Sequence, residues 1–414
     1  MSKATRCDLI VLGGGPAGST AAALLARAGR RVVLLEKDRH PRFHIGESLL
    51  PMNLPIFARL GVLEQVAAIG VEKPGADFAD ATDAGHTTYA FARALRGEYR
   101  YAFQVKRAEL DQLLFQNAAR AGADAREGVT ARDVQLDDSE VRVTVRGESG
   151  EDQTLSARYL IDASGRDTFL GNKLRLKENH PSHRSAALFA HFSGVARRQG
   201  DEAGNISIVR FDDGWVWLIP LREDITSIGA VCRPERLEGV RGRETEALAE
   251  LLAGLPAVAR RLASASQVGP ARLTGNYSYR SRAMTGPRWL MVGDAHAFID
   301  PVFSSGVYLA MRSAERAAEL VHDVLHRPER EAALQAAYAK EVNKGLEEFS
   351  WFICRFMEPT MGRLFARPNN LLKMEQAVTS LLSGDVFEPG LVRLRLLAFK
   401  AVYGASRRRD GASP

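Results

Sequence analysis

Cysteine is scarce in this chain: among its 414 residues only Cys7, Cys232 and Cys354 occur, widely spaced and without a C-x-x-C pair. This set provides neither a disulfide framework nor a zinc site, and it suits a reducing compartment. Long apolar runs are also missing, because no stretch of about 18 residues is apolar and uncharged enough to span a bilayer. The composition therefore argues against a disulfide-rich secreted protein and against a helical membrane protein.

Nucleic-acid-binding motifs and long basic stretches are absent as well, although the net charge is +6. We expect no nucleic-acid partner and no metal; the charge suits a solvated surface or an acidic partner. Lys3, Arg6 and the apolar residues after them imitate a signal peptide, but glycines at 13–15 and Pro16 interrupt its core. We therefore predict a cytoplasmic protein.

What the chain does have is a nucleotide-binding pattern at residues 7–36. An apolar run leads into a glycine turn, an Ala/Leu-rich stretch follows, and a second apolar run ends at Glu36. Gly13 permits the turn, Gly15 lets backbone N–H groups approach a pyrophosphate, and Gly18 lets the helix lie close to the sheet. Glu36 is placed to accept hydrogen bonds from a ribose.

Hydrophobic periodicity along the rest of the chain predicts alternating helices and strands. Leu110, Leu113, Leu114 and Ala118 lie on one face of a predicted mid-chain helix. We expect helices at 57–68, 107–121, 244–262 and 304–325, strands near 87–92, 99–105, 141–145, 155–161 and 289–293, a separate antiparallel sheet within 186–232, and mostly helix beyond 329.

This order of elements predicts an α/β fold with an α+β insert, in which the nucleotide-binding domain is discontinuous. We assign residues 1–75, 100–175 and 270–328 to a Rossmann-type domain. Residues 76–99 and 176–269 then form an inserted antiparallel-sheet substrate domain, and residues 329–414 a helical C-terminal region.

A second nucleotide signature occurs at Gly293-Asp294, after a predicted core strand. A carboxylate there can hydrogen-bond the ribityl hydroxyls of a flavin, although an aspartate that caps a helix is the ordinary alternative. With the first pattern, with Gln104 and Arg107 at the start of the mid-chain helix, and with a loop at 162–165, the set resembles the FAD-binding domain of flavoprotein monooxygenases.

Three further stretches make the chain similar to the flavin-dependent halogenases. Residues 43–51, FHIGESLLP, resemble that family's loop beside the flavin ring. Residues 215–220 match its WxWxIP signature, and residues 298–306 match its FxxPxxSxG signature. The resemblance covers residues 1 to about 325. Including this loop and the second signature, the expected cofactor-binding residues are Gly13, Gly15, Ala17, Gly18, Glu36, Ser48, Gln104, Arg107, Asp294 and Pro301.

The resemblance implies a reaction in which reduced FAD, supplied by a separate flavin reductase, reacts with O₂ to give a hydroperoxide. Chloride or bromide then attacks it to form hypohalous acid, which passes through a tunnel to a lysine. Lys73 aligns with that lysine, and its amine could donate a hydrogen bond to the acid or form a chloramine. Without the resemblance, a lysine in a Pro/Gly loop would be interpreted as a solvated charge.

Two tryptophans and a helix start complete the implied catalytic set. Trp215 and Trp217 are two apart on a strand and face one side, either as a wall that keeps the substrate from the flavin or as an aromatic core pair. Backbone N–H groups of Ser304, Ser305 and Gly306 could hold the halide, although a capped helix without a ligand is the alternative.

Acid–base groups in the loop at 43–51 have two interpretations. Glu47, which we include in the catalytic set, and His44 could relay protons, or they could fasten the loop by hydrogen bonds.

One departure from the family narrows the substrate. In the tryptophan halogenases a glutamate precedes the serine of FxxPxxSxG, whereas this chain has Phe303. This favours an electron-rich phenol or pyrrole over free tryptophan, and members of that branch often act on substrates held by acidic carrier proteins.

Three alternatives remain open at this point. The same fold could serve a hydroxylase or a reductase of the geranylgeranyl type, or it could be a non-enzymatic FAD-binding scaffold. Residues 391–400 with the basic tail at 407–409 could form a membrane-surface helix, although a solvated tail fits better and we expect no membrane partner.

Overall fold

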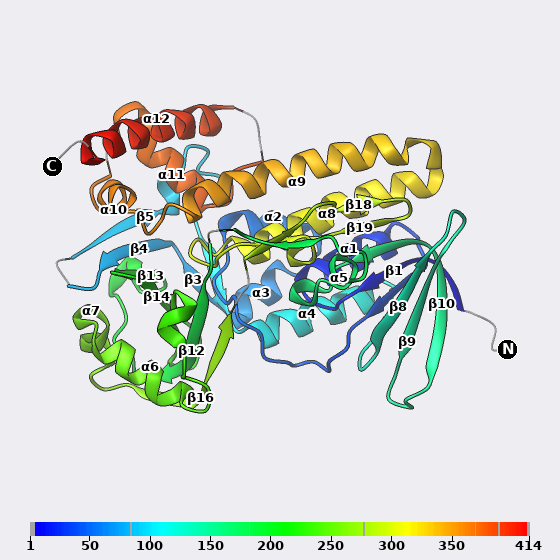
Figure 1. Ribbon diagram of the computed structural model, residues 1–414, viewed down its shortest axis with the longest axis horizontal. Helices are drawn as coiled ribbons and strands as arrows, with labels where there is room; N and C mark the ends of the chain where they lie inside the picture. The colour runs from blue at the N-terminus through cyan, green and yellow to red at the C-terminus, as the bar shows by residue number, and fades with distance from the viewer. Residues whose placement is uncertain are drawn as a thin grey trace.

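The computed structural model describes residues 5–411 except 83, 84, 182, 276, 277, 369, 388 and 389, so Lys3 lies outside the described residues. Figure 1 shows an elongated molecule in which two sheets lie toward opposite ends, with the long helices α8 and α9 running beside one of them. Helices from the C-terminal part of the chain gather over the other end.

The first sheet carries the nucleotide-binding pattern. Its order is β18-β19-β10-β1-β2-β7, and β9 and β8 extend it from β10. The strands β10, β1, β2 and β7 pair in parallel, as does β19 with β10. The bounds are β1 (Thr5–Leu12), β2 (Val32–Leu35), β7 (Asp124–Arg126), β8 (Thr130–Leu136), β9 (Val141–Arg146), β10 (Asp152–Asp162), β18 (Thr285–Gly286) and β19 (Trp289–Met291).

Helices cover this sheet and hold the glycine turn in place. α1 (Pro16–Arg27) follows the turn and packs against both α4 (Arg107–Arg120) and α8 (Ser305–His326). Most residues of α1 are buried, because small alanines let the helix lie close to its neighbours. The short α5 (Phe169–Lys173) follows β10.

The second sheet has the order β16-β12-β15-β14-β13-β4-β5. Its strands are β4 (Gly75–Asp80), β5 (His86–Ala90), β12 (Ala186–Ser193), β13 (Ile206–Phe211), β14 (Gly214–Pro220), β15 (Ile225–Cys232) and β16 (Ser266–Gly275). The strands within 186–232 pair antiparallel as predicted, and the sheet also contains one parallel pair, β4 with β13. The early hairpin β4–β5 joins a sheet made mostly from the later segment, a long-range pairing that local periodicity does not encode.

The remaining strands form two small sheets in addition to the two large ones. β3 (Gly70–Lys73) pairs with β6 (Ala102–Val105), and β11 (Lys177–Asn179), β17 (Tyr279–Ser281) and β20 (Ala297–Phe298) form a three-stranded sheet. With them, the α/β fold that the sequence predicts, with its inserted sheet and helical C-terminal region, is confirmed.

Two predicted helices are interrupted. The helix expected at 57–68 is α2 (Leu54–Arg59) followed by α3 (Leu63–Ile69), because Gly61 adopts a φ of +66° between them. The helix expected at 244–262 divides into α6 (Glu244–Ala253), α7 (Pro256–Ala259) and a 3₁₀ turn. Proline cannot donate the N–H that would continue α6, and the residue before it is extended.

The C-terminal region contains α9 (Glu331–Ile353), α10 (Pro359–Ala366), α11 (Met374–Leu382) and α12 (Leu391–Gly411). α10 contacts β4 and β5, and α12 packs on α10 and α11. Along α12, Leu391, Leu394 and Leu397 are more than half exposed. None of the helices in the described part of the chain is both long and apolar enough to cross a membrane.

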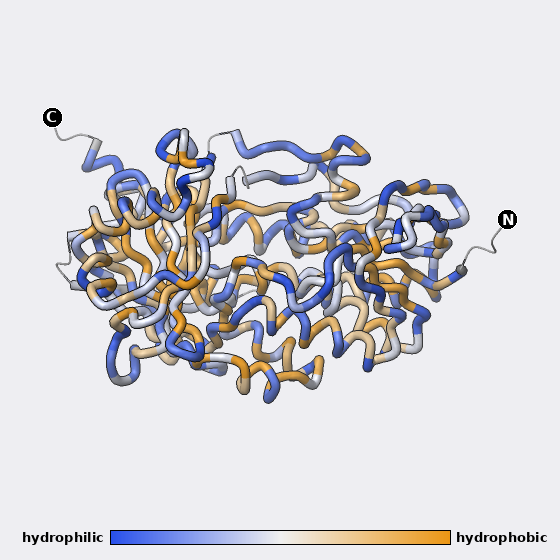
Figure 2. The backbone as a smooth tube through the Cα atoms, turned by 90° about the horizontal axis from the view of Figure 1, so that it is seen from below, coloured by the Kyte–Doolittle hydropathy of each residue, from blue (hydrophilic) through white to orange (hydrophobic). Residues whose placement is uncertain are grey.

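The hydrophobic core shows where a site can form. One continuous core joins the first sheet to one face of the second, including Ile208, Trp215 and Trp217. A separate core under α6 and α7 covers the opposite face, with Leu218, Ile228 and others. Figure 2 shows the hydrophobic segments concentrated inside, with polar segments at outer loops and near the C-terminus. The face carrying the tryptophans therefore points toward the nucleotide-binding domain.

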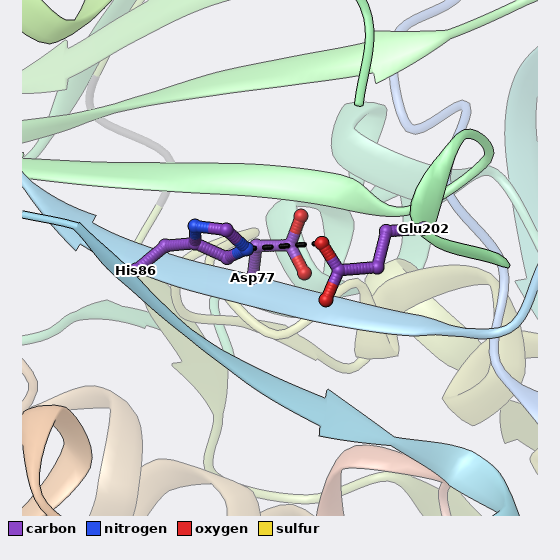
Figure 3. A group of neighbouring side chains, drawn as sticks. All are labelled: Asp77, His86 and Glu202. Atoms are coloured by element: carbon purple, nitrogen blue, oxygen red, sulfur yellow. Dashed lines mark hydrogen bonds and ion pairs between the residues drawn. The ribbon is translucent and has the colours of Figure 1, made fainter. Parts of the chain in front are cut away.

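Side chains from three segments fasten the β4–β5 hairpin to the rest of the second sheet. Asp77, His86 and Glu202 bring their ligand-type atoms within 4.8 Å of one another (Figure 3). His86 bonds Glu202 at 3.0 Å, while the buried Asp77 accepts from Asn205 at 2.9 Å and pairs with Arg198 at 3.3 Å. Because each carboxylate already has protein partners, including a guanidinium, we interpret the cluster as an ion-pair network.

Candidate active site

A cavity of about 350 Å³ lies where the glycine turn, the loop at 42–48 and the second sheet meet. The predicted site residues that line it are Gly13, Gly15, Ala17, Glu36, Glu47, Ser48, Arg107, Trp215, Trp217, Asp294, Pro301, Ser304 and Gly306. Gly18, Lys73, Gln104 and Ser305 are not among the described residues that line this cavity.

The glycine turn has the geometry of a phosphate cradle. Gly13 has a φ of +100°, and a Cβ there would lie 2.3 Å from the carbonyl oxygen of Ala163. A Cβ on Gly18 would lie 1.8 Å from the carbonyl oxygen of Gly13, so Gly18 acts by allowing close packing. A Cβ at Gly15 would face open space, with only Arg42 nearby at 3.6 Å. The N-terminus of α1 is thus open to an anion.

Glu36 lies at the end of β2 on the wall of the cavity, and three protein donors already engage it. Its carboxylate accepts from the backbone N–H groups of Gly14 at 2.8 Å and Asp38 at 3.0 Å, and from Arg42 at 3.2 Å. A carboxylate accepts about four hydrogen bonds, which leaves room for one ribose hydroxyl. Arg42 also pairs with Asp111 at 2.9 Å. Arg42 was not among the predicted site residues, although it lies six residues after Glu36.

Arg107 and Asp294 also line the cavity. Arg107 is held by two bonds to Asp111, at 2.8 and 3.0 Å, and donates to the carbonyl of Ile45 at 2.9 Å. Burial raises the pKa of Asp294 to about 6, and the charge of Arg107 opposes that rise. Gln104 instead turns toward the second sheet and donates to the carbonyl of Gly204 at 3.2 Å.

The residues present fit an FAD group. An open helix N-terminus and Arg42 suit the pyrophosphate, and a carboxylate at the end of β2 suits the adenosine ribose. Asp294 can accept hydrogen bonds from ribityl hydroxyls, and the aromatic side chains of the second sheet offer an apolar wall for a ring system.

The N-terminus of α8 differs from the expected halide site. Ser304 is left-handed, with φ +56° and ψ +21°, a conformation that costs a non-glycine residue about 1–3 kcal/mol. Its N–H donates to the carbonyl of Pro301 at 2.9 Å, so it is not free for a halide as we had expected. The N–H groups of Ser305 and Gly306, in the first turn of α8, have no acceptor within the helix.

Trp215 and Trp217 stand together on β14 and line the cavity. Their ring centroids are 5.8 Å apart at 49°, and the indole N–H of Trp217 donates to Ser227 at 3.2 Å. A Cβ on Gly229 of β15 would lie 2.3 Å from the Trp217 ring, so a glycine there makes room for the indole. Both interpretations of the pair are compatible with this position, because the two rings belong to the core and also form a cavity wall.

Lys73 ends β3 and is 1% exposed. Its Nζ donates to the hydroxyl of Ser48 and to the carbonyl of Leu49, both at 2.9 Å, and lies 5.3 Å from the centre of the Phe91 ring. Among the described residues no carboxylate lies within ion-pair distance of the amine. Burial lowers its pKa from 10.5 to about 7. Since Ser48 itself lines the cavity, a single residue separates the cavity from the amine.

The loop at 42–48 is fastened to the second sheet. Glu47 is 1% exposed and accepts from His191 of β12 at 3.0 and 3.1 Å. Phe43 stacks on Phe189 with centroids 6.1 Å apart, and the guanidinium of Arg272 lies 4.0 Å above the Phe43 ring. His191 was not among the predicted site residues, since nothing in the local pattern of β12 sets it apart.

The neighbouring His44 is neutral at physiological pH. Burial and then the charge of Arg107 lower its pKa to about 4, and its Nδ1–H donates to the carbonyl of Ile45 at 2.8 Å. This supports the loop-fastening interpretation for His44.

Phe303 lies in an aromatic cluster rather than in a polar pocket. Its ring centroid is 5.5 Å from that of Phe356, 6.0 Å from that of Phe365 and 6.4 Å from that of Phe78. All four rings are buried, and they come from the loop before α8, from β4, from the turn after α9 and from α10.

Comparison with known proteins gives the same assignment as the geometry. Residues 6–346 match the FAD binding domain family. The flavin-dependent halogenase gsfI of Penicillium aethiopicum is 35% identical over 372 residues, which cover 83% of this chain and 69% of that protein. The chain belongs to the flavin-dependent halogenases.

Other relatives of this halogenase differ in their substrates. A tryptophan 2-halogenase of Chondromyces crocatus is 37% identical, covering 77% of this chain and 61% of that protein. A 1H-pyrrole-2-carbonyl-[peptidyl-carrier protein] chlorinase of Pseudomonas fluorescens is 28% identical, and the match covers 92% of this chain and 89% of that protein. Among solved structures, a flavoprotein/dehydrogenase from Cytophaga hutchinsonii superposes with a TM-score of 0.89 at 26% identity. The superposition covers 98% of this chain and 100% of that protein.

Proposed function

We propose that this halogenase chlorinates or brominates an electron-rich aromatic ring of the phenol or pyrrole type, and that Lys73 delivers the halogen. The observation that carries the proposal is the buried amine of Lys73, bonded to Ser48, which lines the FAD cavity. A buried lysine that is bonded to a cavity-lining residue, without a carboxylate in ion-pair distance among the described residues, has a reactive rather than an ion-pairing environment.

When bound and reduced by a separate flavin reductase, the flavin supplies hypohalous acid from O₂ and a halide. Around it the chain itself has two tasks. The N–H groups of Ser305 and Gly306, at the positive end of α8, hold the halide. Trp215 and Trp217 keep the organic ring away from the cofactor, so that halogenation rather than hydroxylation follows.

The contacts of Lys73 favour a neutral amine. A neutral amine has two N–H donors and one lone pair, and Lys73 makes two hydrogen bonds, to Ser48 and Leu49. An ammonium would leave a third donor buried, which costs free energy. The lone pair attacks the halogen of hypohalous acid, the halogen–oxygen bond breaks, and the displaced hydroxide takes a proton from the amine to give an N-haloamine and water.

The aromatic surroundings narrow the substrate class. Phe303 and its neighbours offer no carboxylate that could polarise the ring or the N-haloamine, so the ring must itself be electron-rich. The pyrrole chlorinase relative acts on a ring carried by a peptidyl carrier protein, and the positive charge of this chain suits such an acidic partner. We therefore include a carrier-tethered substrate in the proposal.

Product analysis tests this function. The protein is incubated with reduced flavin, O₂ and bromide, together with phenols, free tryptophan, and pyrrole-2-carbonyl groups both free and carrier-bound. We expect a brominated phenol or pyrrole, and its loss in Lys73→Ala while hypobromous acid still forms. Lys106→Ala, a partly exposed lysine paired with Glu223, is the control and should stay active.

Two results would contradict the proposal. A hydroxylated product that does not depend on halide, formed equally by Lys73→Ala, would assign the chain to the hydroxylases. Bromination of tryptophan alone would overturn the substrate class and leave the role of Lys73 intact.

A further inference from the structure

Arg210 is a cation on the substrate side of the second sheet that the proposed reaction does not use. It lies on β13, and since side chains alternate along a strand, it points to the same face as Ile206 and Ile208. Directly across the strand pair is Trp215, which lines the FAD cavity. Arg210 thus occupies the face of the sheet on which the reaction takes place.

In the part of the chain that the structure describes, this guanidinium has no acidic partner. Among the described residues its contacts are the backbone carbonyl of Glu358 at 3.5 Å and the ring of Phe356, 5.3 Å away. Its buried Nε–H has no acceptor at all. By contrast, Arg198 of the same domain pairs with Asp77, and Arg236 pairs with Asp213. Arg210 therefore has spare donors in a fixed fork, which suits an oxyanion.

α10 crosses over Arg210. A Cβ on Gly362 would lie 1.6 Å from the Nη1 of Arg210, so the guanidinium in its present position packs directly against the backbone of α10. α10 lies against β4 and β5 at the end of the molecule where the C-terminal helices gather (Figure 1). Arg210 is only partly buried beneath α10, so part of its side chain is open to solvent.

The distance from Lys73 limits what that anion can be. Arg210 pairs in register with Asp80, and β4 runs from Gly75 to Asp80, about 16 Å at roughly 3.3 Å per residue. Lys73 lies two residues before that strand begins. A carboxylate attached to a single ring cannot reach Arg210 while the ring is beside Lys73, but an anion at the far end of a long flexible arm can.

We propose that Arg210 binds the phosphate of the phosphopantetheine arm through which a carrier protein presents the aromatic substrate. The arm lies along the face formed by β4 and β13, under α10, with its acyl ring at Lys73. The rings of Phe78 and Phe356, whose centroids are 5.9 Å apart, are buried on this face, and the proposal requires them to separate around the arm. This inference rests on the proposed function, since it extends the same site from the ring to its carrier.

Two soluble probes that differ only in the phosphate provide the test. They are pyrrole-2-carbonyl pantetheine and its 4′-phosphate, each halogenated by the intact protein with reduced flavin, O₂ and bromide. We expect the phosphate to lower KM by about tenfold to a hundredfold, with kcat little changed. Arg210→Gln should remove this preference and leave the KM of the phosphate-free probe unaltered, while Arg210→Lys should restore part of it.

Arg236→Gln is the matched control. Arg236 lies over Phe211, the residue next to Arg210 but on the opposite face, so its removal should leave the preference intact. Equal KM values for the two probes in the wild-type protein, or a preference that survives Arg210→Gln, would overturn the inference. Thermal unfolding of each variant shows whether α10 is still docked.

A binding experiment separates this inference from the proposed function. Phosphopantetheine and pantetheine without an aromatic group are titrated against the FAD-loaded protein by calorimetry. Phosphate-dependent binding that Arg210→Gln abolishes supports the anion site even if neither aromatic probe is halogenated. Absence of that binding, with halogenation of both probes, rejects the site and keeps the halogenase.

Discussion

The two compartments on either side of Ser48 are built in opposite ways. The FAD side is an open cavity lined by backbone, by Glu36 and Asp294, and by the fixed guanidinium of Arg107. On the Lys73 side the amine is buried against the ring of Phe91, and among the described residues it has no carboxylate within ion-pair distance. Polar groups suited to a cofactor line one side, and burial lowers the pKa of an amine on the other.

The comparison shows why one fold can serve many substrates. The cofactor compartment depends on atoms that hardly tolerate change, because a Cβ at Gly13 or Gly18 would overlap backbone. The aromatic cluster around Phe303, next to β4, depends instead on the volume of four phenylalanine rings contributed by distant segments. Side-chain volume can vary while packing is kept, so substrate choice can change without loss of FAD binding.

We expect the largest effect from a substitution in the glycine turn, which should abolish FAD binding. Gly18→Ala places a Cβ 1.8 Å from the carbonyl oxygen of Gly13, and neither the helix nor the turn can move away without opening the sheet. We expect FAD binding to be lost, measured as flavin retained after gel filtration. Gly147→Ala, where a Cβ meets no atom within 4 Å, should bind FAD normally. Normal FAD binding by Gly18→Ala would contradict the close-packing argument.

The next effect breaks the aromatic cluster alone. Phe365→Ala removes a buried ring that contacts Phe78, Tyr89 and Phe303, and should lower the free energy of unfolding by about 3–5 kcal/mol. FAD affinity should stay unchanged, and larger phenols should become substrates. Chemical denaturation and flavin titration measure the two quantities. Weaker FAD binding with unchanged stability would reverse our assignment of the two compartments.

The protonation state of Lys73 gives a prediction about pH dependence. With a pKa of about 7, the neutral fraction of Lys73 rises about tenfold between pH 6 and pH 8, because burial depresses the ammonium form. We expect kcat for halogenation to rise with pH over that range. Hypohalous acid formation, followed with a soluble trap, is the control, and a fall in kcat through pH 7 would favour a protonated Lys73.

The smallest effect concerns the loop between the compartments. His191→Ala leaves the buried Glu47 carboxylate without its hydrogen-bond donor, so FAD affinity should fall about threefold. His191→Gln keeps an N–H donor and should lower FAD affinity less. Flavin titration by fluorescence measures both. Identical losses in the two variants would show that the ring of His191, rather than its hydrogen bond, holds the loop.

The cofactor side could be predicted from the sequence because its signals are local. The turn at 13–18, Glu36 and Asp294 each follow a strand, and strand ends meet at one edge of a parallel sheet. Even so, the donors that engage Glu36 could not be foreseen, since Arg42 reaches it through a loop without periodicity. The left-handed Ser304 likewise follows from the turn at Pro301, not from the helical pattern after it.

The amine side was only partly predictable, because its geometry comes from long-range pairing. Lys73 was identified through resemblance, and the burial of its amine depends on β3, on Phe91 and on the loop before α2. The parallel pairing of β4 with β13 brings Phe78 and Arg210 into adjacent strands. No local pattern encodes that pairing, so neither the aromatic cluster nor the unpaired guanidinium could be seen in the sequence.

Ser48 lines the flavin cavity and also accepts a hydrogen bond from Lys73. Any movement of the loop on cofactor binding therefore changes the surroundings of the amine and hence its pKa. By thermodynamic reciprocity, a cofactor that shifts the acidity of Lys73 must itself bind with a pH-dependent affinity. The rate at which an amine-selective acylating reagent labels Lys73 would then report whether the neighbouring compartment is occupied.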